Sequence, residues 1–313
     1  MISGRFDVHA HFKLPDAAPL GATPANNFKA SPMANWSPEM ALEFMNRHGI
    51  ATQMLSIPSA LPPAAARAAN VYCAQIVKQH AERFGLLASL PMTDIEAALS
   101  EVDFAFDMLG ADGVIMMSNY ADDYLGNPKY EPVFAALDRR QATVFIHPAA
   151  PACYECVACG RPGPVIEFPF DTCRTVTDML YAGVLGRFNS ISFILSHAGG
   201  ALPGLARRIA SLGTVSYVPH PPEMTHQTVL SQLGKLYFDT AIAGSASTLV
   251  PVLELAGPDH IVFGTDFPPA TEAVITENIG ALDGLDCLSD EAEAAINHNG
   301  RRLFARFRGA ASS

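Results

Sequence analysis

The sequence predicts an α/β fold in which eight parallel strands and the helices between them close into a (β/α)8 TIM barrel, with elongated loops at its C-terminal face. Short apolar runs alternate with segments of helical period, and eight such runs can be counted. The 313 residues suffice for a barrel of ~250 residues with insertions. Buried parallel strands read as continuous apolar runs, as residues 193–195 and 261–263 do. We therefore expect residues 1–313 to form one domain.

The strands are spaced so that a helix fits after each of them. The first helix begins at Ser37, an N-cap followed by proline at the first helical position, and Gly49 closes it. The predicted strands are Phe6–His9, Gln53–Ile57, Gly85–Leu90, Gly113–Met117, Thr143–His147, Ser192–His197, Leu236–Asp239 and His260–Thr265. The other predicted helices are Ala64–Glu82, Asp94–Leu109, Tyr130–Arg140, Asp171–Leu185, Ala201–Ser211, Ser245–Leu255, Thr271–Leu282 and Ser289–Phe307.

Three connections are longer than usual, namely Phe12–Asn35, Pro148–Phe170 and Gly213–His226. The first two follow strands, so they belong to the face where barrel enzymes build their active sites. The third follows a helix, and we expect it to reach a neighbouring subunit or the barrel rim.

Composition narrows the classes of partner. The net charge of −11 argues against binding to nucleic acid or to an anionic membrane surface, since both need a concentrated basic face. No apolar run approaches the ~20 residues of a membrane span, and the first residues do not have the pattern of a signal peptide. Six cysteines in such a chain are typical of reduced thiols. We expect a cytoplasmic protein.

Histidines and one aspartate end several predicted strands. His9 and His11 lie two residues apart, so both side chains face the same side of the first strand. His147 ends the fifth strand, His197 the sixth and Asp266 the eighth, and in a barrel these ends converge on one mouth. A lone strand-end histidine is more often structural. Three imidazoles and a carboxylate together, however, favour a divalent metal ion, zinc above all, with one open position for water or substrate.

Several short motifs carry a resemblance to a known family. The most specific are Asp7-x-His9-x-His11, Phe145-Ile146-His147-Pro148, Glu167-Phe168-Pro169-Phe170-Asp171-Thr172 with Arg174-Thr175, Ser196-His197-Ala198-Gly199-Gly200 and Gly264-Thr265-Asp266-Phe267-Pro268. With these motifs the chain resembles the amidohydrolase superfamily, and within it the non-oxidative aromatic-acid decarboxylases that include aminocarboxymuconate-semialdehyde decarboxylase. The third and fourth of these motifs resemble the salicylate-type decarboxylases most. The resemblance runs from Asp7 to the final helix.

The resemblance implies roles for five residues. The positions that match in the family bind one divalent metal through His9, His11, His147 and Asp266, whereas His197 stays off the metal and handles protons or metal-bound water. No lysine follows the fourth strand, where two-metal relatives place a bridging ligand, so a mononuclear site is implied. A histidine at position 9 favours zinc over manganese. Relatives of this branch are commonly homodimers or homotetramers.

Two activities fit this ligand set. The first is decarboxylation of a small aromatic or unsaturated carboxylic acid chelated to the metal, with Asp266 or His197 delivering the proton. The alternative is a metal-dependent hydrolase acting on an amide, a lactone or an activated carbon–carbon bond, with His197 as general base. The same metal ligands serve both.

Residues near the predicted mouth are candidates for substrate contacts. Arg174 could clamp a carboxylate, although a surface arginine in the first turn of a helix explains it as well. Phe168 could pack against an aromatic ring or merely anchor its loop, as could Phe170. Asn119 is a further candidate and, like Asp239, could also support the metal ligands.

The loop after the fifth strand contains Cys153-x-x-Cys156-x-x-Cys159, and Cys173 follows downstream. This spacing is compatible with a second metal held by thiolates, or with loop residues that bind nothing. The resemblance supports no cluster there.

Overall fold

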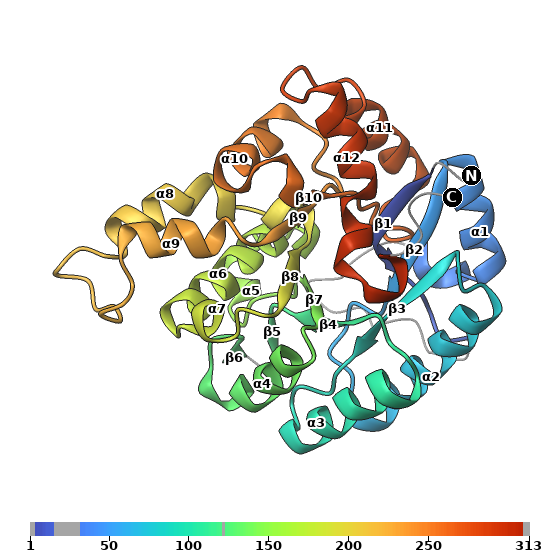
Figure 1. Ribbon diagram of the computed structural model, residues 1–313, viewed down its shortest axis with the longest axis horizontal. Helices are drawn as coiled ribbons and strands as arrows, with labels where there is room; N and C mark the ends of the chain where they lie inside the picture. The colour runs from blue at the N-terminus through green and yellow to red at the C-terminus, as the bar shows by residue number, and fades with distance from the viewer. Residues whose placement is uncertain (1–3, 16–31, 121–122, 309–313) are drawn as a thin grey trace.

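Eight parallel strands form a nearly closed barrel with helices around it in this computed structural model, which describes residues 4–15, 32–120 and 123–308 (Figure 1). Each strand pairs in parallel with the next one in the order of the sheet. The predicted fold class is therefore confirmed. In that order the strands are β1 (Arg5–His11), β2 (Ile50–Ser56), β3 (Phe84–Ser89), β4 (Gly113–Met117), β7 (Thr143–His147), β8 (Ser192–Leu195), β9 (Tyr237–Asp239) and β10 (Ile261–Val262).

The first and last strands meet at a seam that closes the barrel. The amide of Asp266 donates to the carbonyl of His9 at 2.8 Å, and the amide of His11 donates to the carbonyl of Phe267 at 2.7 Å. Ala10 forms an isolated parallel bridge with Phe267. These bonds bring the two histidines of β1 beside the aspartate that follows β10.

The helices surround the strands in Figure 1 and cover the outer face of the barrel. Ser37 caps the first helix by accepting a hydrogen bond from the amide of Met40, as its sequence predicts. The helices are α1 (Pro38–Arg47), α2 (Pro63–Gln79), α3 (Ile95–Asp103), α4 (Glu131–Arg139), α5 (Tyr154–Val157), α6 (Glu167–Tyr181), α7 (Val184–Arg187), α8 (Leu202–Leu212), α9 (His226–Leu233), α10 (Ala246–Ala256), α11 (Glu272–Leu282) and α12 (Asp290–Asn299).

Short elements connect these helices and strands. A π-helical turn, Phe104–Met108, extends α3, and a two-stranded antiparallel hairpin follows β4. The hairpin strands are β5 (Asn119–Tyr120) and β6 (Asp123–Tyr124), and the 3-10 turns are Pro32–Asn35, Pro128–Tyr130, Gly163–Val165, His197–Gly199, Pro258–His260, Gly300–Leu303 and Ala305–Phe307.

The barrel interior is filled by one apolar cluster to which the strands and the C-terminal turns contribute. Burying a side chain of this size contributes roughly 1.5–3 kcal/mol. The hydroxyl of Thr143, at the start of β7, also donates a hydrogen bond to the carbonyl of Leu303. This bond holds the C-terminal turns against the N-terminal end of that strand. The cluster consists of Phe6, Val8, Met54, Leu87, Ile115, Phe145, Ile194, Val262, Leu303, Phe304 and Phe307.

Several predicted boundaries are wrong. Helix α6 begins at Glu167 rather than Asp171. Pro169 lies in its first turn, where backbone amides have no partner within the helix, so the missing amide of proline breaks no helical hydrogen bond. The helix ends at Tyr181, because Gly183 adopts a left-handed conformation with φ of 71°. The final helix ends at Asn299, before two 3-10 turns, and α9 was not predicted.

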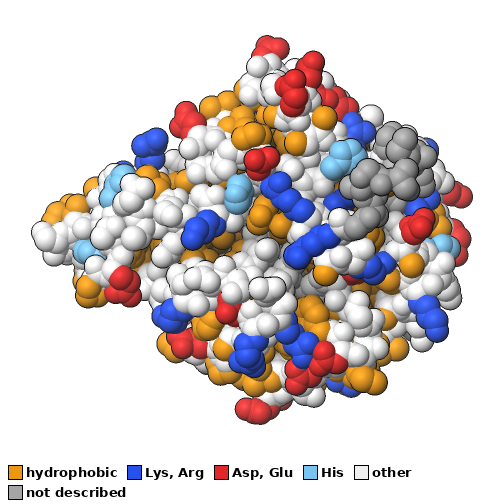
Figure 2. Space-filling model, in the orientation of Figure 1, with side chains coloured by type: hydrophobic (Ala, Val, Ile, Leu, Met, Phe, Trp, Pro, Cys, Tyr) orange, Lys and Arg blue, Asp and Glu red, His pale blue; other side chains and the backbone are white. Residues whose placement is uncertain are grey.

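The three predicted long loops have different outcomes. Residues 16–31 of the first lie outside the described residues. The second contains α5 and a 3-10 turn before α6 begins. The third, between α8 and α9, extends away from the body of the protein as an arm (left in Figures 1 and 2), on which the Tyr217 side chain is 80% exposed.

On the face seen in Figure 2, basic side chains are interspersed with acidic, apolar and neutral ones. Across the described part of the chain, no helix combines the length and apolar character that a membrane span requires.

Candidate metal centre

Four side chains predicted to bind a metal converge at the C-terminal end of the barrel. One potential ligand atom from each of His9, His11, His147 and Asp266 lies within 4.8 Å of the other three, and all four residues are buried. Asp266 Oδ1 is 3.3 Å from His9 Nε2 and 3.1 Å from His11 Nε2. The two Nε2 atoms are 3.1 Å apart. Strand ends far apart in sequence therefore meet as the barrel topology predicts.

A bulge in β1 aims its histidines into the barrel. Asp7 pairs with Gln53 of β2 and Ala10 with Leu55, so β1 has one extra residue between these pairs. Such a bulge shifts the alternation of side chains and commonly re-aims a residue near an active site. Val8 consequently belongs to the interior cluster, while the next residue, His9, also packs on that cluster through Phe145.

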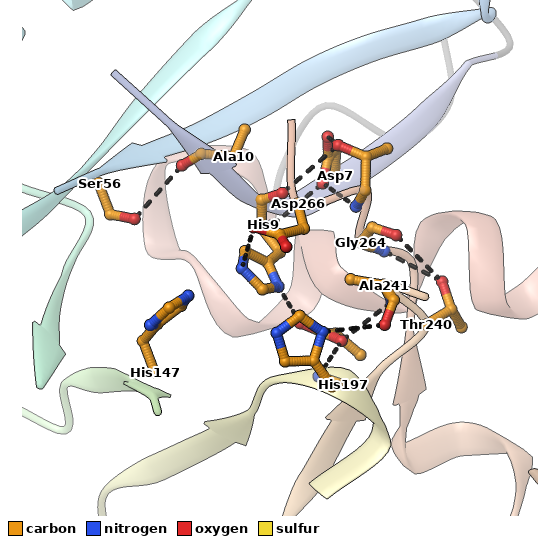
Figure 3. A network of polar contacts seen from close by, with 12 residues as sticks. Asp7, His9, Ala10, Ser56, His147, His197, Thr240, Ala241, Gly264 and Asp266 are labelled. Carbon is orange, nitrogen blue, oxygen red and sulfur yellow. Dashed lines mark hydrogen bonds and ion pairs between the residues drawn. The ribbon is translucent and has the colours of Figure 1, made fainter. Parts of the chain in front are cut away.

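Asp239, at the end of β9, supports His9 and His197, two of the residues labelled in Figure 3. Its Oδ2 accepts a hydrogen bond from His9 Nδ1 at 2.7 Å, and its Oδ1 accepts one from the amide of His197 at 2.7 Å. Asp239 is fully buried. A carboxylate behind a metal-binding imidazole fixes the orientation and tautomer of the ring, so Asp239 has the supporting position considered for it from the sequence.

Hydrogen bonds fix the ring orientation of the other histidines in the same way. His147 Nδ1 donates to the carbonyl of Pro148 at 2.9 Å, and His197 Nδ1 donates to the carbonyl of Ala241 at 3.1 Å. Ser56 donates its own hydroxyl to a backbone carbonyl, so its oxygen can accept from His11 Nδ1 at 3.0 Å. With Nδ1 engaged, each ring presents Nε2 as its free nitrogen.

The charges at this site are unevenly distributed. Burial opposes a charge on His9, but the carboxylates of Asp239 and Asp266 outweigh it and raise the pKa of His9 to about 10. Burial lowers the pKa of His11 and of His147. Burial alone would raise the pKa of Asp266, yet the neighbouring histidines hold it well below its ordinary value. Without a cation, His9 is thus the site's protonated ligand.

The donor set fits a divalent cation. Asp266 Oδ1 is buried and makes no well-aligned hydrogen bond among the described residues, although it lies 3.3 Å from His9 Nε2 and 3.1 Å from His11 Nε2. A buried carboxylate oxygen without a donor is costly unless a positive charge is close to it. Three imidazole nitrogens and one carboxylate oxygen are a common ligand set for zinc, and a set with mixed nitrogen and oxygen donors also accepts manganese.

Asp7 begins the motif that contains His9 and His11, and the sequence alone indicated no role for it. Its buried carboxylate accepts hydrogen bonds from the Thr265 hydroxyl at 2.6 Å, from Gln53 Nε2 at 2.9 Å and from the amide of His9 at 3.0 Å. Thr265 precedes Asp266, so Asp7 ties β1 to the segment after β10. Its position two residues before His9 was the available signal, but its partners are distant in sequence.

The three candidate substrate contacts have protein partners. The Arg174 guanidinium lies 3.7 Å from the carboxylate of Asp171 and 3.8 Å from that of Glu167, both on its own helix. The Phe168 ring packs so closely over Gly163 that a Cβ there would come within 2.5 Å of it. Asn119 Nδ2 donates to Asp171 and to the carbonyl of Ala150.

The cysteines of the loop after β7 do not form a ligand set. Cys153, Cys156 and Cys159 are exposed free thiols, whereas Cys173 is buried in α6. Within residues 4–15, 32–120 and 123–308, no group of side chains that could hold a metal includes a cysteine. The second, thiolate-bound metal that the spacing left open therefore has no preformed ligand set among the described residues.

The fold and the site together define the class of protein. A sequence profile described as amidohydrolase matches residues 6–306, which is nearly the whole chain. The chain belongs to the amidohydrolase family.

Curated relatives of this chain are decarboxylases. It is 33% identical to Decarboxylase yanB of Aspergillus niger, over 97% of this chain and 88% of that protein. It is 31% identical to 6-methylsalicylic acid decarboxylase of Penicillium expansum, over 97% of both chains.

Solved structures have the same fold. An amidohydrolase II structure superposes with a TM-score of 0.85 at 29% identity, covering 96% of this chain and 99% of that one. A dihydroxybenzoic acid decarboxylase from Polaromonas sp. JS666, solved with manganese and the inhibitor 2-nitroresorcinol, gives a TM-score of 0.80 at 20% identity, covering 96% of each chain. At that identity the likeness concerns the fold.

Proposed function

We propose that this protein is a metal-dependent non-oxidative decarboxylase, a carbon–carbon lyase, that acts on a small aromatic acid with a hydroxyl beside its carboxylate. The observation that carries the proposal is the convergence of His9, His11, His147 and Asp266 as one ligand set. Similarity to 6-methylsalicylic acid decarboxylase over 97% of both chains supports the substrate class. A mononuclear centre is proposed, with zinc as the first candidate; manganese in a structural neighbour supports the second.

The reaction replaces a carboxylate by a proton on one ring carbon. The proton adds to that carbon, the bond to the carboxylate breaks, and the electron pair of that bond returns to the ring as CO2 leaves. A metal held by His9, His11, His147 and Asp266 would supply positive charge that attracts the acid and stabilises the negative charge that develops on the hydroxyl oxygen as the bond to the carboxylate breaks.

Two side chains are proposed to move the proton. His197 has its Nδ1 bonded to the carbonyl of Ala241 and its amide bonded to Asp239, so its ring is held with Nε2 free to exchange a proton. Asp266 has one buried oxygen without a well-aligned hydrogen bond among the described residues. Both groups remain candidates for the acid, but Asp266, whose pKa the neighbouring histidines hold low, must first take up the proton that it delivers. His9, His11 and His147 are bound through Nδ1 to protein atoms and are assigned to the metal alone.

Arg174, Phe168 and Asn119 are still proposed to contact the substrate, but the hydrogen bonds of Asn119 limit which of its atoms can do so. Both amide hydrogens of Asn119 have acceptors in the protein. Its side-chain contact with substrate is therefore assigned to the carbonyl oxygen, which suits a substrate hydroxyl.

The test is to incubate the metal-loaded protein with a panel of hydroxybenzoates and a panel of amides, esters and lactones. We expect CO2 and the corresponding phenol from acids with an ortho hydroxyl, and little turnover of the meta and para isomers. Hydrolysis of a lactone or amide without CO2 from any acid would show that the hydrolase alternative is the correct one.

We further propose a single-domain enzyme that forms homodimers or homotetramers in the cytoplasm. The exposed Tyr217 on the arm between α8 and α9 supports a contact between subunits. The six free cysteines are in the state expected of a reducing compartment. The mass in solution, measured by light scattering, tests the assembly.

A further inference from the structure

Asp171 is a buried carboxylate for which the proposed chemistry has no direct use. It lies in α6 and is fully buried. Its Oδ2 accepts hydrogen bonds from the hydroxyl of Ser118 and from Asn119 Nδ2, the latter at 2.8 Å, and its Oδ1 accepts one from the hydroxyl of Tyr124 at 2.7 Å. All three donors belong to the end of β4 and the hairpin after it. Arg174 Nη1 is 3.7 Å away.

Two of these donors, Ser118 and Asn119, also form hydrogen bonds with the segment that follows β7. The amide of Ser118 donates to the carbonyl of His147 at 2.8 Å. The Ser118 hydroxyl oxygen accepts from the amide of Ala149 at 2.8 Å, and Asn119 Nδ2 donates to the carbonyl of Ala150 at 3.0 Å. Three hydrogen bonds therefore hold residues 147–150 against the end of β4.

That segment sets the orientation of His147. Its Nδ1 donates to the carbonyl of Pro148. Pro148 lies between His147 and Ala149, and both of these residues form hydrogen bonds with Ser118. A displacement of residues 148–150 would move this carbonyl and rotate the imidazole. Asp171 accepts the hydrogen of the Ser118 hydroxyl and so fixes the rotation of that group, which leaves a lone pair of its oxygen facing the amide of Ala149.

We propose that Asp171 is a positioning residue for the metal centre. It orders Ser118 and Asn119, these order the backbone after β7, and that backbone aims His147 Nε2 at the other ligands. The proposal rests on the proposed metal site. It explains why an aspartate of α6, outside the strand-end ligand set, is buried among hydrogen-bond donors from β4 and its hairpin. Partners behind a metal ligand typically change metal affinity by 10–100-fold.

The test is the Kd of Mn²⁺ or Zn²⁺ for the metal-free protein and its variants, measured by calorimetry. Asp171→Ala removes the acceptor of Ser118 and Asn119, and we expect the Kd to rise at least about 10-fold. Ser118→Ala breaks the same link with a smaller change in volume and should act in the same direction, so the test remains valid if the first variant folds poorly.

Asp171→Asn should restore most of the affinity. The amide oxygen can accept from Ser118 and Asn119 while the NH2 group donates to the hydroxyl oxygen of Tyr124. We expect a Kd within about 3-fold of wild type. An Asp171→Asn variant as weak as Asp171→Ala would overturn the hydrogen-bonding route.

A matched control variant distinguishes an effect on the position of His147 from a general loss of protein stability. Glu101 is another buried carboxylate, bonded to Arg67 and Asn70 between α2 and α3. Glu101→Ala should lower the unfolding temperature and leave the metal Kd unchanged. If Asp171→Ala and Ser118→Ala also bind metal like wild type, the Asp171 proposal fails alone. If wild type binds no metal, the proposed function fails as well.

Discussion

At the scale of single residues, the four imidazoles around the mouth of the barrel are proposed to have two different roles, although each has its Nδ1 bonded to a protein atom. His9, His11 and His147 converge with Asp266, whereas His197 lies beside them with its Nδ1 on the carbonyl of Ala241. The ring centroids of His9 and His197 are 5.1 Å apart. This closeness shows why sequence position alone cannot separate ligand from acid.

We predict that His147→Ala abolishes tight metal binding, whereas His197→Asn retains the metal and loses turnover by about 10²–10⁴-fold. The first variant removes one of four ligands; the second removes a proton carrier that is not counted among them. Metal content by elemental analysis and kcat for CO2 release distinguish the two effects. Full activity in His197→Asn would contradict the role proposed for His197.

The protonation of His9 gives a prediction for pH. With its pKa raised to about 10, metal-free His9 carries a proton at pH 7 that a cation must displace from Nε2. Metal binding should release about one proton, and its affinity should weaken about 10-fold for each unit that the pH falls below that pKa. In the metal-free protein, the interaction of His9 with Asp239 stabilises the fold at neutral pH and is lost as the pH rises through about 10.

Calorimetric titrations of Mn²⁺ in buffers of different ionisation enthalpy measure this proton. Asp239→Asn should lower the pKa of His9 and reduce the number of protons released. Release that is unchanged in this variant would show that Asp239 does not hold the charge on His9.

At the scale of elements, helix α6 and the segment after β8 fit together through a glycine. Gly200 has φ of 59°, and a Cβ there would come within 2.2 Å of the carbonyl oxygen of Pro169. The amide of Ala201 donates to that same carbonyl at 3.1 Å. Two of the motifs that carry the family resemblance, residues 167–172 and residues 196–200, thus pack against each other, which their separation in sequence does not reveal.

Gly200→Ala should therefore destabilise the protein by at least about 1–3 kcal/mol, because an L-residue is strained at this φ and the backbone of α6 blocks the methyl group. Gly204→Ala in α8 is the matched control, since a Cβ there meets no atom within 4 Å. Thermal unfolding of both variants is the measurement. Equal stability of the two would refute this packing argument.

At the scale of the whole molecule, the metal centre joins strands from both ends of the chain. Its donors come from β1, from β7 and from the segment after β10, and the seam between β1 and β10 has few backbone hydrogen bonds. A cation bound by all three should stabilise the closed barrel.

Removal of the metal with a chelator should lower the unfolding temperature. A metal present at 100 times its Kd contributes about 2.7 kcal/mol, which corresponds to roughly 5 °C for a chain of this size. Calorimetry with and without added metal measures the shift. The same shift in His147→Ala would show that chelation acts elsewhere.

The sequence alone determined the number and order of the barrel strands and the residues that lie at or just after their ends. These features are local, because a buried strand and a helix each leave a period in the chain, and barrel topology then places every strand end on one face. His9, His11, His147 and Asp266 could be grouped for this reason.

Only the tertiary structure decided how those residues are held. Three features depend on partners from 40 to 230 residues away in the chain. They are the bulge in β1, the hydrogen bonds of Asp239 to two histidines and the hydrogen bond from Ser118 to Asp171. The spacing of the three cysteines in the loop after β7 suggested a metal cluster, but the fold of that loop leaves all three thiols exposed. A periodic pattern reports which face of an element is buried, but not which distant hydrogen-bond partner it meets there.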